Sequence, residues 1–384
     1  MGTKAVLAAS EPIRIRITNV YMEGDYTGVI AVGSQRKATN VILDTGSSTL
    51  ALDGAFYDPS GDQNAKVTDV AQEVTYGSGA WVGAVVQTDV AVGGKDLAQV
   101  NVAVAYRESA NMFGKSNGIL GLAYRPLNNA YTMPGPTWPP KFTYNAIQEG
   151  RVTHLTPYFT QLVQKGLTPN KFAFYTQRSM VSYETANPAT DPKNEGYLVL
   201  GGGEESTDLY NGGFQSVAVV ADEYYNTNLK AIIVGNSEPI TVPPPTKGSG
   251  NLSNSIVDSG TNSLTLNQEL FNTVVERFSR GENREFVHAM RAGYVPMSSL
   301  NTKQWPNLTF VLQGESQDVK LTVTPDNYWQ VNAPERGRAS APLFGDNNQL
   351  HGQSILGLPL MNGYFTIFDR SADRLGTIKF APRR

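Results

Sequence analysis

Cysteine is absent from this 384-residue chain, and histidine occurs only three times. Without cysteine no disulfide can stabilise the fold, and such a composition is typical of a reducing compartment or a bacterial source. The histidines, His154, His288 and His351, lack the spacing of metal ligands, so we interpret them as solvated loop or helix residues. We expect neither a metal site nor a cofactor.

Long apolar segments and a strong excess of one charge are absent as well. No apolar run approaches the about 20 residues that span a bilayer, and residues 5–9 form too short an apolar segment for a signal peptide. The 31 basic and 34 acidic residues nearly balance, which gives no reason to expect a nucleic acid or a membrane as a partner. We therefore expect a cytoplasmic protein.

Glycine, proline and tyrosine are abundant instead, with 37, 22 and 18 residues. This composition favours an all-β protein with many turns over a helical bundle. The chain is also long enough for two domains, each with its own core.

A strand pattern leads directly into Asp44. Residues 41–43 are Val-Ile-Leu, and Asp44 is followed by Thr45, Gly46 and Ser47. The branched apolar run predicts a buried strand, and the glycine with its hydroxyl-bearing neighbours predicts a tight turn. One carboxylate is thus expected at the end of a rigid strand, surrounded by hydrogen-bond donors.

The same pattern returns 214 residues later. Residues 255–257 are Ser-Ile-Val, and Asp258 is followed by Ser259, Gly260 and Thr261. Two such motifs, each behind an apolar strand, are far rarer by chance than one. Two carboxyls held close together share one proton over a range of acid pH, because they cannot both ionise cheaply. One of them can then activate a water while the other donates a proton to a carbonyl.

The two aspartate motifs resemble the paired catalytic loops of the pepsin-like aspartic peptidases. Residues 74–79 (VTYGSG) resemble the flap hairpin of that family, and residues 117–124 (NGILGLAY) and 354–358 (SILGL) resemble the two segments that support the catalytic loops. The order of motifs occurs twice, which indicates a repeat at the scale of a domain. Without cysteine, the chain resembles most the bacterial members called shewasins.

This resemblance implies a bilobal pepsin-like acid protease fold, with two pseudo-twofold-related β-barrel-like lobes and a few short helices. We expect an N-terminal lobe, residues 1–177, with Asp44 and the flap, and a C-terminal lobe, residues 178–384, with Asp258. Helical spacing predicts a helix over residues 267–278. Another helix is expected to begin with Thr156 as its N-cap and to end at Gly166.

The resemblance also implies roles for the residues that follow the two catalytic aspartates. Thr45 and Ser259 would form hydrogen bonds across the lobe boundary beneath the carboxyls. A second hydroxyl in each motif, that of Ser47 or Thr261, would donate to an outer carboxylate oxygen. The glycine of each motif, Gly46 or Gly260, would let the substrate backbone approach. A hydroxyl at position 261 favours an acidic optimum, since relatives adapted to neutral pH often have alanine there.

The flap and the apolar walls of the substrate subsites map to Tyr76, Gly77, Ser78, Gly79, Ile42 and Ile119. An ordinary surface hairpin would give the same local pattern as the flap. The chain departs from the family at Ala51, where a tryptophan often supports the flap tyrosine. We expect Trp81 to replace part of that packing.

We therefore predict a monomeric aspartic endopeptidase that cleaves peptides or unfolded proteins between bulky hydrophobic residues at acidic pH and is inhibited by pepstatin. A catalytically weak or inactive member of the fold, which binds or inhibits other proteins, is the alternative, although such proteins usually have a damaged motif. A Ser-His-Asp hydrolase would need a G-x-S-x-G motif at a strand-to-helix turn; residues 114–118 (GKSNG) fit the pattern, but they overlap the NGILGLAY segment. A two-carboxylate glycosidase would not explain the repeated turns.

Overall fold

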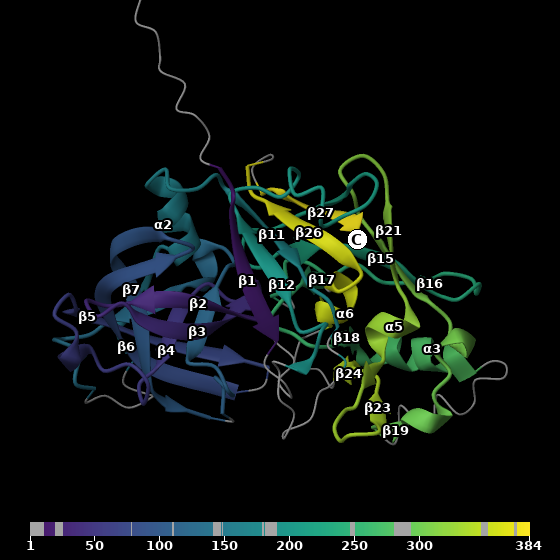
Figure 1. Ribbon diagram of the computed structural model, residues 1–384, viewed down its shortest axis with the longest axis horizontal. Helices are drawn as coiled ribbons and strands as arrows, with labels where there is room; N and C mark the ends of the chain where they lie inside the picture. Colours follow the sequence, from purple (N-terminus) through teal and green to yellow (C-terminus); the bar gives the residue numbers. More distant parts are fainter. Residues whose placement is uncertain are drawn as a thin grey trace, which may run out of the picture.

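The computed structural model of the protein is dominated by strands (Figure 1). It describes residues 11–19, 26–77, 79–109, 111–140, 147, 149–178, 180, 190–245, 250–279, 293–346, 352–371 and 375–384. Helical segments within these ranges are short. The predicted all-β class is therefore confirmed.

Strands from the first half of the chain close into a barrel. Among the described residues the barrel strands follow the order β6-β7-β4-β8-β3-β2, and β2 pairs again with β6. Valine and alanine dominate the long strands β6 and β7, which suits a surface that is packed on a core. The strands of this half are β1 (Ile13–Asn19), β2 (Tyr26–Val32), β3 (Lys37–Asp44), β4 (Leu50–Asp53), β5 (Lys66–Tyr76), β6 (Gly79–Val92), β7 (Lys95–Glu108), β8 (Gly118–Gly121), β9 (Asn129–Thr132), β10 (Arg151–His154) and β11 (Lys171–Tyr175).

Strands from the second half form several smaller sheets. The sheet that carries the second aspartate motif has the order β14-β17-β25-β18-β24. The strands are β12 (Gly196–Leu200), β13 (Gln215–Ala218), β14 (Asn226–Thr227), β15 (Leu229–Val234), β16 (Ile240–Thr241), β17 (Ser255–Val257), β18 (Leu264–Asn267), β19 (Val295–Pro296), β20 (Leu308–Leu312), β21 (Val319–Val323), β22 (Gln330–Val331), β23 (Arg338–Ser340), β24 (Leu343–Asp346), β25 (Ser354–Leu356), β26 (Tyr364–Asp369) and β27 (Thr377–Pro382).

The same pairing pattern occurs in both halves, as the repeated motifs predict. In the first half β8 pairs in parallel with β3 and antiparallel with β4, and β4 pairs in parallel with β7. In the second half β25 pairs in parallel with β17 and antiparallel with β18, and β18 pairs in parallel with β24. The two aspartate motifs therefore leave equivalent strands, β3 and β17, at equivalent places.

A central group of strands joins the two halves. Strand β1 pairs with β2 of the barrel and with β12, and the sheet continues through β11, β26, β27 and β13. Figure 1 shows these strands between the barrel on the left and helix α3 on the right. Because β11 pairs with β12 and β26, strands from both sides of residue 177 share one sheet. The proposed lobe boundary at that residue stays a prediction.

Aromatic side chains fill the space beside the central strands. The rings of Phe172 and Phe368 stack with centroids 5.1 Å apart, and Tyr225 packs against Phe368 at 4.5 Å. The buried Tyr225 hydroxyl donates a hydrogen bond to the Leu122 carbonyl at 3.0 Å. Large rings bury much apolar area, so this cluster holds the two halves in contact close to the loops that carry the aspartates.

The helices and 3-10 turns are α2 (Tyr158–Gln164), α3 (Gln268–Ser279), α5 (Pro325–Tyr328), α6 (Leu358–Met361), η1 (Pro59–Gly61), η2 (Arg125–Leu127), η4 (Met297–Ser299) and η5 (Thr302–Gln304). Helix α3 confirms the helix predicted over residues 267–278, and Asn267 accepts hydrogen bonds from the amides of Glu269 and Leu270 at its start.

Helix α2 confirms the second predicted helix but corrects its N-cap. Pro157 occupies the N-cap position and no side chain caps the helix, so the N-cap role predicted for Thr156 is wrong. The Thr156 carbonyl instead accepts a bond from the Gln161 side chain. Gly166 has φ +68° just after the last turn, as predicted for a C-terminal glycine.

Of the histidines, His154 lies exposed on β10, and His288 and His351 fall outside the described residues. In the described ranges no helix is long and apolar enough to cross a membrane.

Candidate active site

Parallel strand pairs deliver the two aspartates. Asp44 is the last residue of β3 and lies beside Gly121 of β8. The Asp44 carbonyl accepts a hydrogen bond from the Leu122 amide at 2.7 Å. Asp258 follows β17, and its own amide donates to the Leu356 carbonyl of β25 at 3.1 Å. Both aspartates therefore sit on backbone that a neighbouring strand holds in place.

A glycine in each supporting segment allows close contact with the catalytic loop. A side chain at Gly121 would place its Cβ 2.5 Å from the backbone of Ser48 and Thr49. At Gly357 a Cβ would lie 2.2 Å from the Thr261 carbonyl oxygen. Such distances leave no room for any side chain, which explains the glycine of both Ile-Leu-Gly segments.

Thr45 and Ser259 exchange hydrogen bonds across the boundary between the two halves. The Thr45 amide donates to Ser259 Oγ at 3.0 Å, and the Ser259 amide donates to Thr45 Oγ1 at 2.8 Å. Each hydroxyl then donates onward, Thr45 to the Val257 carbonyl and Ser259 to the Leu43 carbonyl. All of these atoms are buried, so each loop satisfies the buried polar groups of the other.

This exchange places the two carboxyls face to face. A Cβ added to Gly46 would lie 2.7 Å from the Asp258 carboxyl, and one added to Gly260 would lie 2.3 Å from Asp44 Oδ1. Each glycine therefore lets the opposite aspartate come close. Approach of a substrate backbone to the same glycines stays a prediction.

The donors around the two carboxyls are unequal. Each aspartate accepts a bond from an amide two residues ahead, Gly46 to Asp44 at 2.7 Å and Gly260 to Asp258 at 2.9 Å. Asp258 also accepts a bond from the Thr261 hydroxyl at 2.6 Å. The hydroxyl of Ser47 is buried and has no partner of good hydrogen-bond geometry among the described residues. It still lies near enough to lower the pKa of Asp44.

Burial is the main influence on the proton of Asp44. It raises the pKa of the Asp44 carboxyl far above its ordinary value, and the nearby Asp258 carboxyl raises it further. The closeness of the Ser47 hydroxyl and the bond from the Gly46 amide oppose this rise only in part. The pair therefore holds a proton well above the pH at which a free aspartate loses it, and it titrates as a unit.

A hairpin formed by β5 and β6 brings Tyr76 to the site. Pairing runs to Tyr76 and Gly79, with Gly77 in the turn, while Ser78 lies outside the described residues. The residue is partly exposed as a whole, yet burial of its hydroxyl raises the pKa of Tyr76, and the nearby Asp44 raises it again. The tyrosine hydroxyl therefore stays protonated close to the carboxyls.

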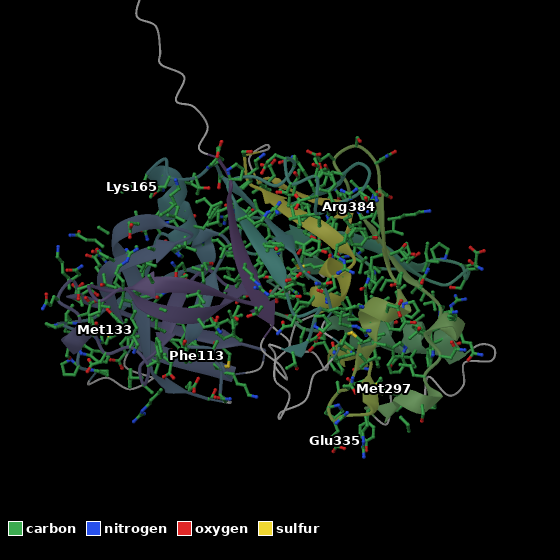
Figure 2. The ribbon with its side chains drawn as sticks, viewed as in Figure 1. Phe113, Met133, Lys165, Met297, Glu335 and Arg384 are labelled. Atoms are coloured by element: carbon green, nitrogen blue, oxygen red, sulfur yellow. The ribbon has the colours of Figure 1, made fainter. Side chains whose placement is uncertain are left out.

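An apolar cluster holds this tyrosine from behind. Trp81 is completely buried, and its indole N–H donates to the Tyr76 hydroxyl at 3.4 Å. The cluster consists of Ile42, Ala51, Trp81, Ala103, Ala105, Phe113 and Ile119, with Val74 and Tyr76 packed against it. Figure 2 labels Phe113 near the lower edge of the first half. Trp81 and Ala51 thus belong to the same cluster, while the replacement of the lost packing by Trp81 stays a prediction.

The match to known proteins covers this whole arrangement. The family model described as eukaryotic aspartyl protease matches residues 25–381. The chain belongs to the eukaryotic aspartyl protease family, the pepsin-like proteases.

Several curated members of the family are similar along most of their length. Cathepsin D of Chionodraco hamatus is 24% identical over 383 residues, covering 94% of this chain and 82% of the relative. Gastricsin of Cavia porcellus is 23% identical, covering 93% and 80%, and pepsin A of Gallus gallus is 22% identical, covering 97% and 88%. The expected likeness to bacterial shewasins stays a prediction.

Tyr224 lies near the two carboxyls, at a position that the sequence patterns did not indicate. Strand β14 pairs antiparallel with β17, and the Val257 amide donates to the Tyr225 carbonyl. Tyr224 lies in the turn that precedes β14, near enough to both carboxyls to interact with them electrostatically. Burial raises the pKa of Tyr224, with further increases from Glu223, Asp258 and Asp44 in that order. A tyrosine before a two-residue strand has no local signature that could have revealed this position.

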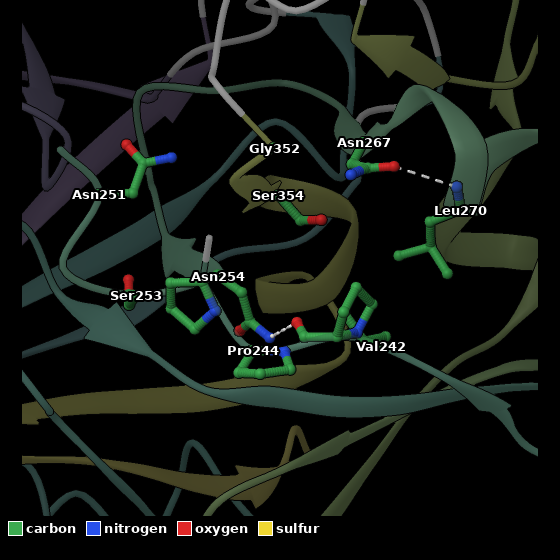
Figure 3. A pocket seen from close by; sticks show the side chains of 11 residues that line it. Val242, Pro244, Asn251, Ser253, Asn254, Asn267, Leu270, Gly352 and Ser354 are labelled. Atoms are coloured by element: carbon green, nitrogen blue, oxygen red, sulfur yellow. Dashed lines mark hydrogen bonds between the residues drawn. The ribbon is translucent and has the colours of Figure 1, made fainter. Parts of the chain in front are cut away.

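A separate small pocket lies in the second half of the chain (Figure 3). Its volume is about 40 Å³, which suits a few water molecules but not a peptide. Neither Asp44 nor Asp258 lines this pocket. The lining residues are Val242, Pro243, Pro244, Pro245, Asn251, Ser253, Asn254, Asn267, Leu270, Gly352 and Ser354. Within the described part of the chain, no group of three side chains suits a metal ion.

The bond from Thr261 to Asp258 predicts a shift of the pH profile in the Thr261→Ala variant. A hydrogen bond to a charged group contributes about 1.5–3 kcal/mol, and about 1.4 kcal/mol corresponds to one pH unit. Loss of this donor destabilises the singly ionised pair, so the acid limb of kcat/KM should move upward by about one pH unit. The Ser263→Ala variant removes a nearby hydroxyl contact to Thr265 and should keep the wild-type profile. An unshifted Thr261→Ala profile would contradict the assigned role.

The Trp81 contact predicts a loss of turnover in the Trp81→Phe variant. The change removes the indole donor to Tyr76 and part of a fully buried ring system, so kcat/KM for a hydrophobic peptide should fall about threefold to tenfold. Trp138→Phe is a matched control, because it removes an indole bond to Ser60 on the surface. Equal kcat/KM values for the two variants would show that Trp81 does not position the flap.

Proposed function

We propose that this protein is an aspartic endopeptidase that hydrolyses peptides and unfolded proteins at acidic pH. The observation that supports the proposal best is the intact pair of carboxyls, buried and held face to face by the exchange between Thr45 and Ser259. Catalytically silent members of a fold usually lose such groups. Here every residue of the two aspartate motifs is present, which supports catalysis over a binding role.

The unequal donors favour the shared proton on Asp44. Asp258 accepts two bonds from its own loop, including the short bond from Thr261, which stabilises its charged form. Burial and the nearby Asp258 carboxyl raise the pKa of Asp44. A water between the carboxyls would give a proton to Asp258 and attack the scissile carbonyl carbon, while Asp44 donates its proton to the carbonyl oxygen. Asp258 then gives the proton that it took from water to the amide nitrogen, a hydroxyl of the tetrahedral intermediate returns a proton to Asp44, and the C–N bond breaks.

The residues around the pair favour an apolar substrate. Ile42 and Ile119 are neighbours across β3 and β8, and both belong to the cluster that supports Tyr76. We propose that this wall prefers bulky hydrophobic residues beside the cut and that pepstatin, a transition-state mimic, blocks the site.

The Asp44→Asn and Asp258→Asn variants test the mechanism. Each should reduce peptide cleavage at pH 3–5 by at least about 10³-fold, because an amide can neither accept the proton of water nor take part in the shared ionisation. Cleavage of an unfolded protein is followed with and without pepstatin. Asp53→Asn is the control, since its Oδ1 only accepts a bond from the Ala55 amide, which an asparagine oxygen can also accept. Full activity in Asp44→Asn would refute the proposal, and no cleavage by folded wild-type protein would favour a binding module.

The stability of the same variant gives an independent check on Asp44. Because its pKa is raised on folding, the carboxyl contributes stability that is fully present below its unfolded pKa of about 3.9 and is lost as pH rises through the folded value. Asp44→Asn removes this dependence. Its free energy of unfolding should therefore decline less than that of the wild type between pH 4 and neutral pH, as measured by chemical denaturation.

A further inference from the structure

A fully buried group of polar side chains lies at the base of the flap hairpin. Gln72 of β5 is 1% exposed, and its Nε2 donates to Asn128 Oδ1 at 2.9 Å and to the Asn129 carbonyl at 2.8 Å. The Thr49 hydroxyl donates to the same Asn128 oxygen at 2.8 Å. Thr49 and Asn128 are also buried. An amide in such a place is tolerated only when its bonds are made, so the three side chains have fixed relative positions.

The three residues come from the segments that build the site. Thr49 directly follows the catalytic loop of Asp44, and Asn128 follows the segment that supports this loop from β8. Gln72 lies four residues before Tyr76 on β5. Side chains alternate along a strand, so Gln72, Val74 and Tyr76 point to one face. Val74 and Tyr76 pack against the cluster of Trp81, which confirms that this face is turned inward.

We propose that Gln72 is a positioning residue for the flap. Its amide fixes the base of β5 against the catalytic loop and thereby sets where Tyr76 lies relative to the carboxyls. Trp81 holds the same tyrosine from the side through its hydroxyl. Apolar packing alone would bury β5 equally well, but directional bonds to two acceptors allow only one position of the strand. The expected effect on kcat/KM rests on the proposed peptidase function, whereas the expected effect on the position of the flap does not.

The test compares Gln72→Met with Gln87→Met. Methionine keeps the length of glutamine and loses both donors. Gln87, on β6, makes a similar amide bond to Asn101 at 3.1 Å, far along the hairpin from Tyr76. We expect Gln72→Met to lower kcat/KM for a hydrophobic peptide at least tenfold, and Gln87→Met to leave it within twofold of the wild type. Melting temperatures of both variants show whether loss of stability accounts for the effect.

Hydrogen exchange of the flap gives a readout that does not depend on catalysis. Amides of residues 73–77 should exchange at least tenfold faster in folded Gln72→Met than in the wild type, and at the wild-type rate in Gln87→Met. If Gln72→Met does not fold, Thr49→Val removes the hydroxyl that donates to Asn128 and accepts a long bond from Gln72, and it should give a smaller change in the same direction.

The outcomes separate this proposal from the proposed function. Unchanged flap exchange and unchanged kcat/KM in folded Gln72→Met would overturn the positioning role. A wild-type protein that cleaves no peptide would count against the peptidase, while faster flap exchange confined to Gln72→Met would still support the role of Gln72 in placing Tyr76.

Discussion

The reciprocal hydrogen bonds between Thr45 and Ser259 are the constraint on which the site depends. Neither loop can satisfy its own buried amide and hydroxyl, because the partners come from the other half of the chain. The bonded residues are 214 positions apart. The two carboxyls therefore meet only after both halves have folded and docked. The central sheet and the aromatic cluster around Phe368 make that docking favourable by burying a large apolar area.

The close approach of the two carboxyls has an electrostatic cost. Two buried carboxyls repel each other when both are ionised, and burial disfavours even one charge. The loops offset part of this cost with amide donors at Gly46 and Gly260 and with the Thr261 hydroxyl. On the side of Asp44 the nearby Ser47 hydroxyl lowers the pKa of the carboxyl, although its hydrogen-bond geometry is poor. The result is a pair in which one charge is stabilised and one proton is retained, which is the state that general acid–base catalysis requires.

Much of this arrangement could be predicted from local patterns. The strand-Asp-hydroxyl-Gly motif depends on neighbours in sequence, and the same is true of the Ile-Leu-Gly segments and of helix α3. Their repetition predicted two related halves. The need for glycine at positions 121 and 357 also follows from their place in the Ile-Leu-Gly segments, since each one packs against the backbone of an aspartate loop.

Other features depend on contacts that no local pattern encodes. A glutamine in a strand looks the same whether it faces water or a buried acceptor, so Gln72 gave no signal. Tyr224 comes near the carboxyls through the turn before β14, which pairs with β17 far along the chain. The N-cap of α2 was predicted from the preference of threonine for that position, but the helix begins one residue later, after Pro157. The pairing of β11 with β26 also shows that the halves share a sheet that sequence motifs alone do not reveal.

A double-mutant cycle on Thr45→Val and Ser259→Ala tests the central claim most directly. The measurement is kcat/KM at the pH optimum for the wild type, the two single variants and the double variant. If the reciprocal bonds place the carboxyls, each single change should cost about 10²-fold, and the double change should cost little more, since both remove the same arrangement. Independent effects that multiply, or single variants with wild-type kcat/KM, would contradict the account.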